Sequence, residues 1–215
     1  MLPIQKLFIN HNYSVRNAKI EYIIIHDVGA SSTAKNNRDY FNVADRGASA
    51  DFFVDSTNII QLIDYNKNNS WAVGDGKNKY GINNKNSISI EMCLEANLRP
   101  SSATVTNTIN LVQSLMLGLN LTQEKVLRHY DASKKLCPKS MSNNNWSLWL
   151  DFKKQLLPPV IEKKPSYQER YVREFQKFYN TVTKTTSPIS VDGLWGVETF
   201  KALNILESLL KGEYK

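Results

Sequence analysis

A proline-rich segment constrains the organisation of this chain more than any other feature of the sequence. Three prolines stand within residues 158–165. Because proline fixes φ and lacks a backbone N–H, they disfavour a helix and favour an extended connector. The sequence therefore predicts a domain at 1–156, a linker at 157–166 and a module at 167–215. The last part is too short to bury a large core, so we expect it to be a small all-α module.

Within residues 1–156, segments with strand periodicity alternate with helical ones. The β-branched run at 20–25 and the alternating pattern at 87–94 predict strands, while 33–45 and 103–119 predict helices. Shorter segments predict a hairpin at 51–63, a strand at 125–129 and a helix at 146–156. Strands that alternate with helices indicate an α/β domain with a mixed central sheet flanked by helices.

Three candidate metal ligands stand at the ends of predicted strands. His26 follows the run at 20–25, His129 ends the strand at 125–129, and Cys137 comes eight residues later. Two imidazoles and a thiolate form a borderline-soft donor set that suits Zn²⁺. Three protein ligands leave a fourth position for water, which is the arrangement of a catalytic zinc site.

Each of these residues also has an ordinary structural interpretation. A single histidine at a strand end is more often a hydrogen-bonded structural residue than a ligand. Cys137, beside Pro138, is alternatively a small core residue or a disulfide partner of Cys93. A reducing compartment argues against that disulfide. The spacing alone therefore leaves the metal site and the structural interpretation both open.

Two further residues fit a hydrolytic site. In its alternating strand, Glu91 shares a face with Ser89 and Cys93, and a carboxylate in the middle of a strand is disfavoured. Glu91 is either on a solvent-facing side of the sheet or a general base near a zinc-activated water. Lys135, two residues before Cys137, is either a solvated surface lysine or a group that stabilises a tetrahedral oxyanion.

Four segments, in matching order, carry a resemblance to a known family. They are Ile-Ile-Ile-His at 23–26, Trp-Ala-Val-Gly-Asp-Gly at 71–76, Ser-Ile-Ser-Ile-Glu at 87–91, and the segment from His-Tyr-Asp to Lys-Leu-Cys-Pro at 129–138. Over residues 15–155 the chain resembles the zinc-dependent type 2 N-acetylmuramoyl-L-alanine amidases. The likeness is greatest to phage endolysins of Gram-positive hosts, and the fold is shared with peptidoglycan recognition proteins.

The resemblance implies a role for each candidate residue. His26, His129 and Cys137 would hold one zinc ion per chain. Glu91 would be the catalytic carboxylate, and Lys135 would stabilise the transition state. The implied reaction is hydrolysis of the amide bond between N-acetylmuramic acid and L-alanine in bacterial peptidoglycan.

One segment departs from the family pattern. Some members place a catalytic tyrosine in the segment that matches residues 50–53, where this chain has none, so more weight falls on Glu91. Non-catalytic recognition proteins typically lack the thiolate ligand, so Cys137 favours an enzyme. The alternatives are such a recognition protein and a zinc peptidase acting within the stem peptide. We expect Trp71, in the loop-rich stretch 64–86, to line the substrate groove.

The C-terminal module is predicted to contain two amphipathic helices. The side chains expected to face inward are Val172, Phe175, Phe178 and Tyr179 in the first, and Phe200, Leu203, Leu206 and Leu210 in the second. Between them, Asp192-Gly193 predicts a tight turn that holds Trp195 between the helices. The segments 175–176 and 191–199 resemble helical peptidoglycan-binding modules, so Trp195 is a candidate wall-binding residue.

The net charge of +7, from 27 basic and 20 acidic residues, favours a polyanionic partner. No run of five like charges occurs, which argues against nucleic acid, and the resemblance favours anionic wall polymers. No apolar run is long enough for membrane insertion. The first six residues lack the blocks of a signal peptide. We therefore expect synthesis in the host cytoplasm and action on the wall after release; no oligomeric state is predicted.

Overall fold

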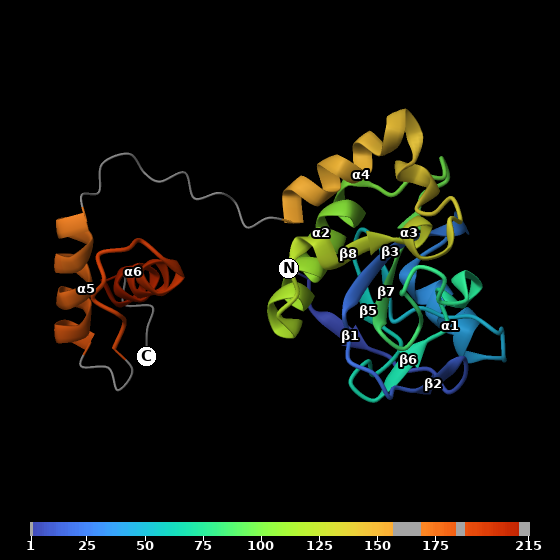
Figure 1. The fold of residues 1–215 in the computed structure, drawn as a ribbon, viewed down its shortest axis with the longest axis horizontal. Helices are drawn as coiled ribbons and strands as arrows, with labels where there is room; N and C mark the ends of the chain where they lie inside the picture. The colour runs from blue at the N-terminus through green and yellow to red at the C-terminus, as the bar shows by residue number, and fades with distance from the viewer. Residues whose placement is uncertain (1, 157–168, 184–187, 211–215) are drawn as a thin grey trace. The chain divides into compact units, whose positions relative to one another are not determined.

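The computed structural model describes residues 2–156, 169–183 and 188–210. The chain forms two compact units, Met1–Pro159 and Val160–Lys215 (Figure 1). The linker expected at 157–166 lies outside the described residues. The division into a catalytic domain, a linker and a wall-binding module therefore stays a prediction.

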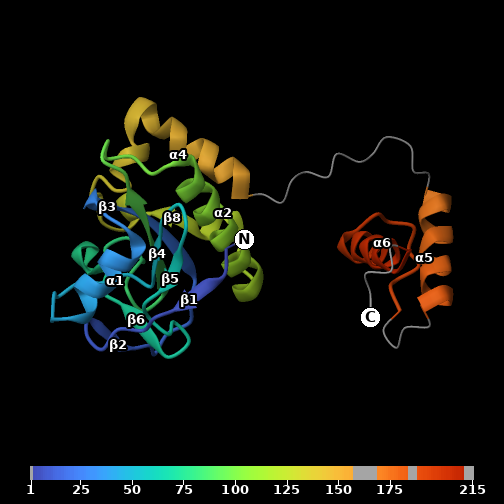
Figure 2. The same cartoon turned by 180° about the vertical axis from the view of Figure 1, so that it is seen from behind.

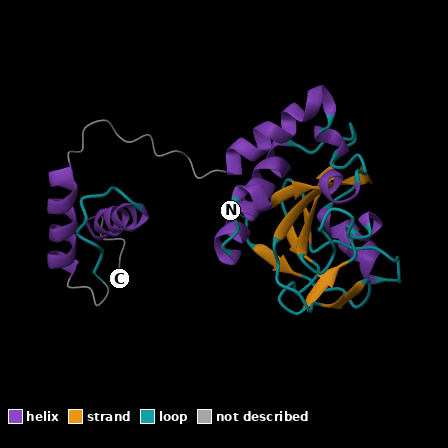
Figure 3. Ribbon diagram, viewed as in Figure 1, coloured by secondary structure: helices purple, strands orange, loops and turns teal. Residues whose placement is uncertain are grey.

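A six-stranded mixed sheet forms the middle of the first unit (Figure 3). Its strands, in spatial order, are β1 (Ile4–Lys6), β5 (Ile59–Gln61), β4 (Phe52–Val54), β7 (Ser87–Leu94), β3 (Tyr22–Ser31) and β8 (Val126–Arg128). β4 and β5 form the predicted antiparallel hairpin, and the other neighbours pair in parallel. A second sheet pairs β2 (Tyr13–Val15) with β6 (Asn68–Ser70). The expected α/β fold with a mixed central sheet is confirmed.

Helices cover both faces of the large sheet. α2 (Ser102–Leu119) and α4 (Asn143–Leu156) lie side by side against one face (Figure 2). α1 (Ala34–Asn42) packs on the opposite face. The helix predicted at 33–45 is shorter than expected, because it ends at Asn42. The Thr33 side chain caps its start by accepting the backbone N–H of Asn36.

The structure corrects two details of the strand assignments. β3 extends to Ser31, so His26 lies within the strand and not at its end. The parallel pairing with β7 continues past His26 and keeps this segment extended. β8 ends at Arg128, and His129 is the first residue of a short helix, α3 (His129–Ser133).

Strand β7 follows its predicted bounds and is covered on both sides. Ile90 is fully buried on one side, and Ser89 and Cys93 are buried on the other. The solvent-facing alternative for the Glu91 side of this strand is therefore wrong. The cover on that side comes partly from α1, because Cys93 belongs to the same apolar cluster as Ala34.

The second unit contains helices α5 (Glu169–Thr183) and α6 (Val197–Leu210). Val172 and Tyr179 face inward as expected. Phe178, Phe200 and Leu210 do not, since they are 57%, 44% and 87% exposed.

Part of the interior of this unit is polar instead. Gln176 is buried, and its amide donates to Asp192, Leu194 and Thr199, which is itself buried. The Gln176 carbonyl oxygen accepts the N–H of Gly193, whose φ of +76° suits glycine. This network forms the predicted turn, and Trp195 packs against a ring of α5. Among the described residues, no helix has both the length and the apolarity needed to cross a bilayer.

Candidate metal centre

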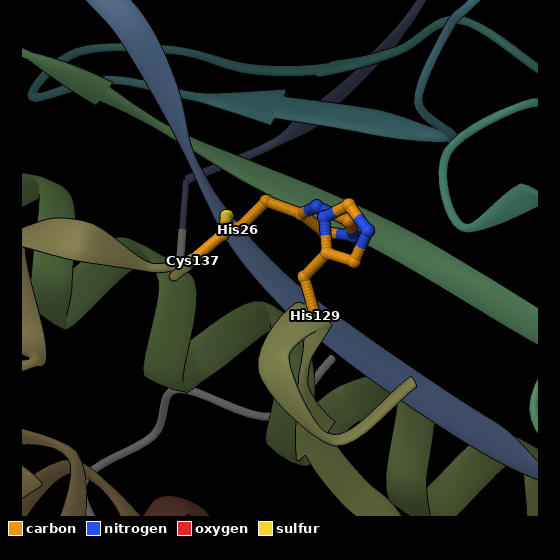
Figure 4. Close-up of side chains that lie close together, drawn as sticks. All are labelled: His26, His129 and Cys137. Carbon is orange, nitrogen blue, oxygen red and sulfur yellow. The ribbon is translucent and has the colours of Figure 1, made fainter. Parts of the chain in front are cut away.

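His26, His129 and Cys137 converge on one side of the large sheet (Figure 4). Their potential ligand atoms all lie within 4.8 Å of one another, and all three residues are buried. The two imidazole ring centroids are 4.6 Å apart. Parallel pairing explains the meeting of the histidines. Ile25 of β3 lies opposite Arg128, the last residue of β8, and a histidine directly follows each of them in the chain.

The donor atoms fit a divalent metal ion. His26 Nε2 and His129 Nδ1 are buried without a hydrogen-bond partner among the described residues, which is costly unless a ligand satisfies them. Burial lowers the pKa of His26 well below its ordinary value, and burial also lowers the pKa of His129. Both imidazoles are therefore held in the neutral form that binds a metal.

Both cysteines are free thiols, so the disulfide alternative for Cys93 and Cys137 is wrong. Burial raises the pKa of the Cys137 thiol, and the negative charge of Glu91 adds to this. Metal binding at Cys137 must therefore release a proton. Two imidazole nitrogens and one thiolate are a usual donor set for zinc.

Glu91 stands opposite His26 in the pairing of β7 with β3, and its Oε1 lies 3.7 Å from His26 Nδ1. The Glu91 side chain is 19% exposed, and its Oε2 is buried without a hydrogen-bond partner in the described part of the chain. Burial, and next the charge of Asp27, raise the pKa of Glu91 to about 8, against an opposing effect of Lys135. A carboxyl group with such a pKa can take up and return a proton near neutral pH.

These residues open onto a cleft of about 640 Å³. Trp71 and Lys135, both expected at the site, are among the residues that line it. Trp71 is anchored because its indole N–H donates to Ser14 Oγ at 2.8 Å. Lys135 is exposed, and its charge acts on the pKa of both His26 and Glu91. The structure thus brings six predicted residues to one cleft, while Trp195 belongs to the second unit.

Residues 16–140 match a protein family described as N-acetylmuramoyl-L-alanine amidase. The chain belongs to this family. The amidase CwlL of Bacillus licheniformis is 32% identical over 154 residues, which cover 64% of this chain and 42% of CwlL. The amidase XlyB of Bacillus subtilis (strain 168) is 30% identical over 151 residues, which cover 67% of this chain and 47% of XlyB.

The chain therefore spans about half the length of the curated relatives that it matches. A solved structure, a mutant endolysin from Bacillus subtilis, superimposes with a TM-score of 0.63 at 30% identity. That match covers 73% of this chain and 99% of the endolysin chain. Almost the whole chain of this solved endolysin structure therefore has the same fold as the matching part of this protein.

Two carboxylates beside the candidate metal ligands are not among the site residues that the sequence predicts. Asp27 fixes the loop that carries Cys137, because it accepts the backbone N–H groups of Lys139 at 3.0 Å and Ser140 at 2.6 Å. Asp75 lies 2.8 Å from His129 Nε2. Asp27 directly follows His26 in the sequence, and Asp75 lies in the segment 71–76 that carries part of the family resemblance. Asp75 comes close only through tertiary packing.

Proposed function

We propose that this chain is a zinc-dependent amidase that cleaves the bond between N-acetylmuramic acid and L-alanine in peptidoglycan. The observation that carries the proposal is the convergence of His26, His129 and Cys137 within 4.8 Å, beside Glu91, in a chain of this family. The free, buried ligand atoms of the two histidines support the presence of a metal.

His26, His129 and Cys137 would hold one zinc ion, which when bound supplies Lewis-acid polarisation of the scissile carbonyl. Glu91 takes a proton from the attacking water and later gives it to the leaving amine. Lys135, on the cleft wall, stabilises the negative charge that develops on the carbonyl oxygen. Trp71, which also lines the cleft, offers a ring against which the substrate packs.

The second unit would hold the enzyme on the cell wall, with Trp195 among the contact residues. Such tethering raises the concentration of the catalytic cleft near its substrate. The net charge of +7 would add attraction to anionic wall polymers. In this proposal the protein acts on the wall after release from the cell that makes it, as the endolysin resemblance implies.

Digestion of purified sacculi tests the proposal directly. An amidase releases new amino termini that are all L-alanine, and it creates no new reducing sugar ends. A recognition protein would release neither, and a peptidase within the stem would release a different amino terminus. Elemental analysis of the same preparation should find one zinc per chain, and a preparation without zinc that still cleaves would contradict the metal assignment.

A further inference from the structure

The tight turn η1 (Gly74–Gly76) contains Asp75 and packs against helix α3. The first residue of α3 is His129, one of the proposed metal ligands. Asp75 Oδ1 lies 2.8 Å from His129 Nε2, and Asp75 Oδ2 accepts the Ser133 hydroxyl at 3.2 Å. His129 and Ser133 are the first and last residues of α3. One carboxylate therefore contacts both ends of this short helix.

The packing of the turn requires a glycine next to Asp75. A Cβ atom built on Gly76 would lie 2.3 Å from the carbonyl oxygen of Ala132 in α3 and 3.1 Å from its carbonyl carbon. Both atoms are backbone, so they cannot move away as a flexible side chain would. The close approach that brings Asp75 to His129 thus depends on the missing side chain at position 76.

The contact determines which nitrogen of His129 keeps a lone pair. A neutral imidazole carries one proton, and an acceptor at Nε2 holds the proton there. His129 Nδ1, which is buried and without a partner among the described residues, is then left as the electron-pair donor. His129 is one of the three residues, with His26 and Cys137, whose potential ligand atoms lie within 4.8 Å of one another.

We propose that Asp75 is a positioning residue that fixes the tautomer and the ring orientation of His129 for metal binding. It touches no reacting atom, since it acts through the imidazole. This inference rests on the metal centre of the proposed function. Partners of this kind typically change metal affinity by about 10–100-fold when they are removed.

Zinc affinity, measured by competition with a chelator, tests this role. We expect Asp75→Ala to bind zinc about 10–100-fold more weakly than the wild type. Asp75→Asn keeps an oxygen that can accept from Nε2 and should restore part of the loss. Ser133→Ala, the matched control, removes the hydroxyl that contacts Asp75 and the Lys135 backbone N–H but leaves the His129 contact. Its affinity should stay within about 3-fold of the wild type.

The tautomer itself gives a readout that a merely structural role would not move. Nitrogen NMR of the zinc-free protein at a pH where the imidazole is neutral should show His129 protonated at Nε2 in the wild type. In Asp75→Ala the signal should shift toward a mixture of both tautomers, while thermal unfolding confirms that the variant is folded. An unchanged tautomer, or zinc affinity within about 2-fold of the wild type, would overturn the inference.

Gly76→Ala provides a second variant that leaves the carboxylate in place. Because the new Cβ meets the backbone of α3, it should push the turn away and weaken zinc binding, as Asp75→Ala does. Wild-type affinity in Gly76→Ala would contradict the role assigned to the turn. If the wild type itself binds no zinc, the proposed function fails. If the wild type binds zinc and the variants bind it equally tightly, only the inference about Asp75 fails.

Discussion

The two faces of the central sheet are built from the same strands but are covered in different ways. The face under α2 and α4 has one continuous apolar cluster, which includes Ile23 and Ile25 of β3. The other face has two smaller clusters. On β3, Ile24 belongs to one of them and Val28 to the other. His26 lies between these two residues on the same side of the strand.

The difference shows how one sheet combines stability with a reactive site. A continuous apolar cover stabilises the fold by removing hydrocarbon from water. An interrupted cover leaves room for His26 and Glu91. Each has a buried polar atom without a hydrogen-bond partner within the described ranges, which would be costly in a closed core.

Cys137→Ser should have the largest effect on function and a small effect on the metal-free fold. A serine hydroxyl does not replace a thiolate as a zinc ligand, so we expect loss of stoichiometric zinc and of all detectable amidase activity. Elemental analysis and sacculus digestion measure these two losses. Stoichiometric zinc in the folded variant would contradict the ligand assignment.

Glu91→Ala should separate chemistry from metal binding on the same face. Because Glu91 is proposed to transfer protons and not to hold the metal, the variant should keep its zinc and lose about 10²–10⁴-fold in turnover. Glu91→Gln, which preserves the shape, should lose a similar factor. Turnover equal to that of the wild type in either variant would rule out the general-base role.

Ile90→Ala changes the residue next to Glu91 in the sequence but on the opposite face of β7. Ile90 is fully buried in the continuous cluster, so removing its side chain should lower the free energy of unfolding by about 2–5 kcal/mol. Zinc affinity at temperatures where the variant is folded should stay unchanged. Urea unfolding and chelator competition measure the two quantities, and a loss of zinc without a loss of stability would contradict the division between the faces.

The strands differ in how far the sequence predicts them. Strand β7 follows its prediction at both ends because its alternating pattern is long and matches the buried sheet. Strands β1, β2 and β6 have three residues each and are partly polar or exposed. Their pairing comes from tertiary contacts, so no local pattern reveals them.

The candidate site is predictable as a set of residue types and not as a geometry. His26 and His129 are recognisable beside apolar segments, yet the extension of β3 and the start of α3 depend on strand pairing across the sheet. Asp75 is 54 residues from His129 in sequence and reaches it only because Gly76 lets the turn pack against α3. In the second unit, the exposed Phe200 shows that helical periodicity cannot foresee a polar network around Gln176.

Asp51 gives a predicted effect on stability that depends on pH. It is fully buried two residues before Phe53, and its Oδ2 accepts hydrogen bonds from Ser70 Oγ at 2.6 Å and the Ser89 backbone at 2.8 Å. Its Oδ1 is buried and has no hydrogen-bond partner among the residues that the structure describes. Burial raises the pKa of Asp51 from 3.8 to about 6, although these hydrogen bonds and the charge of Arg16 act in the opposite direction.

Because the folded state holds this proton more tightly than the unfolded state, the stabilisation is fully present below the unfolded pKa of 3.8. It is lost as the pH rises through about 6. A pKa difference of this size corresponds to on the order of 3 kcal/mol. In Asp51→Asn, which cannot ionise, this part of the pH dependence should disappear. The free energy of unfolding of the metal-free wild type should therefore fall relative to the variant between about pH 4 and about pH 7.

Urea unfolding at several pH values, with a chelator present, measures that difference. Asp151→Asn is the matched control, because Asp151 is 59% exposed and lies on α4 at the other face. Its curve should run parallel to that of the wild type. A parallel curve for Asp51→Asn as well would mean that the interrupted face tolerates a buried charge at no cost. The contrast between the two faces would then be one of shape alone and not of polarity.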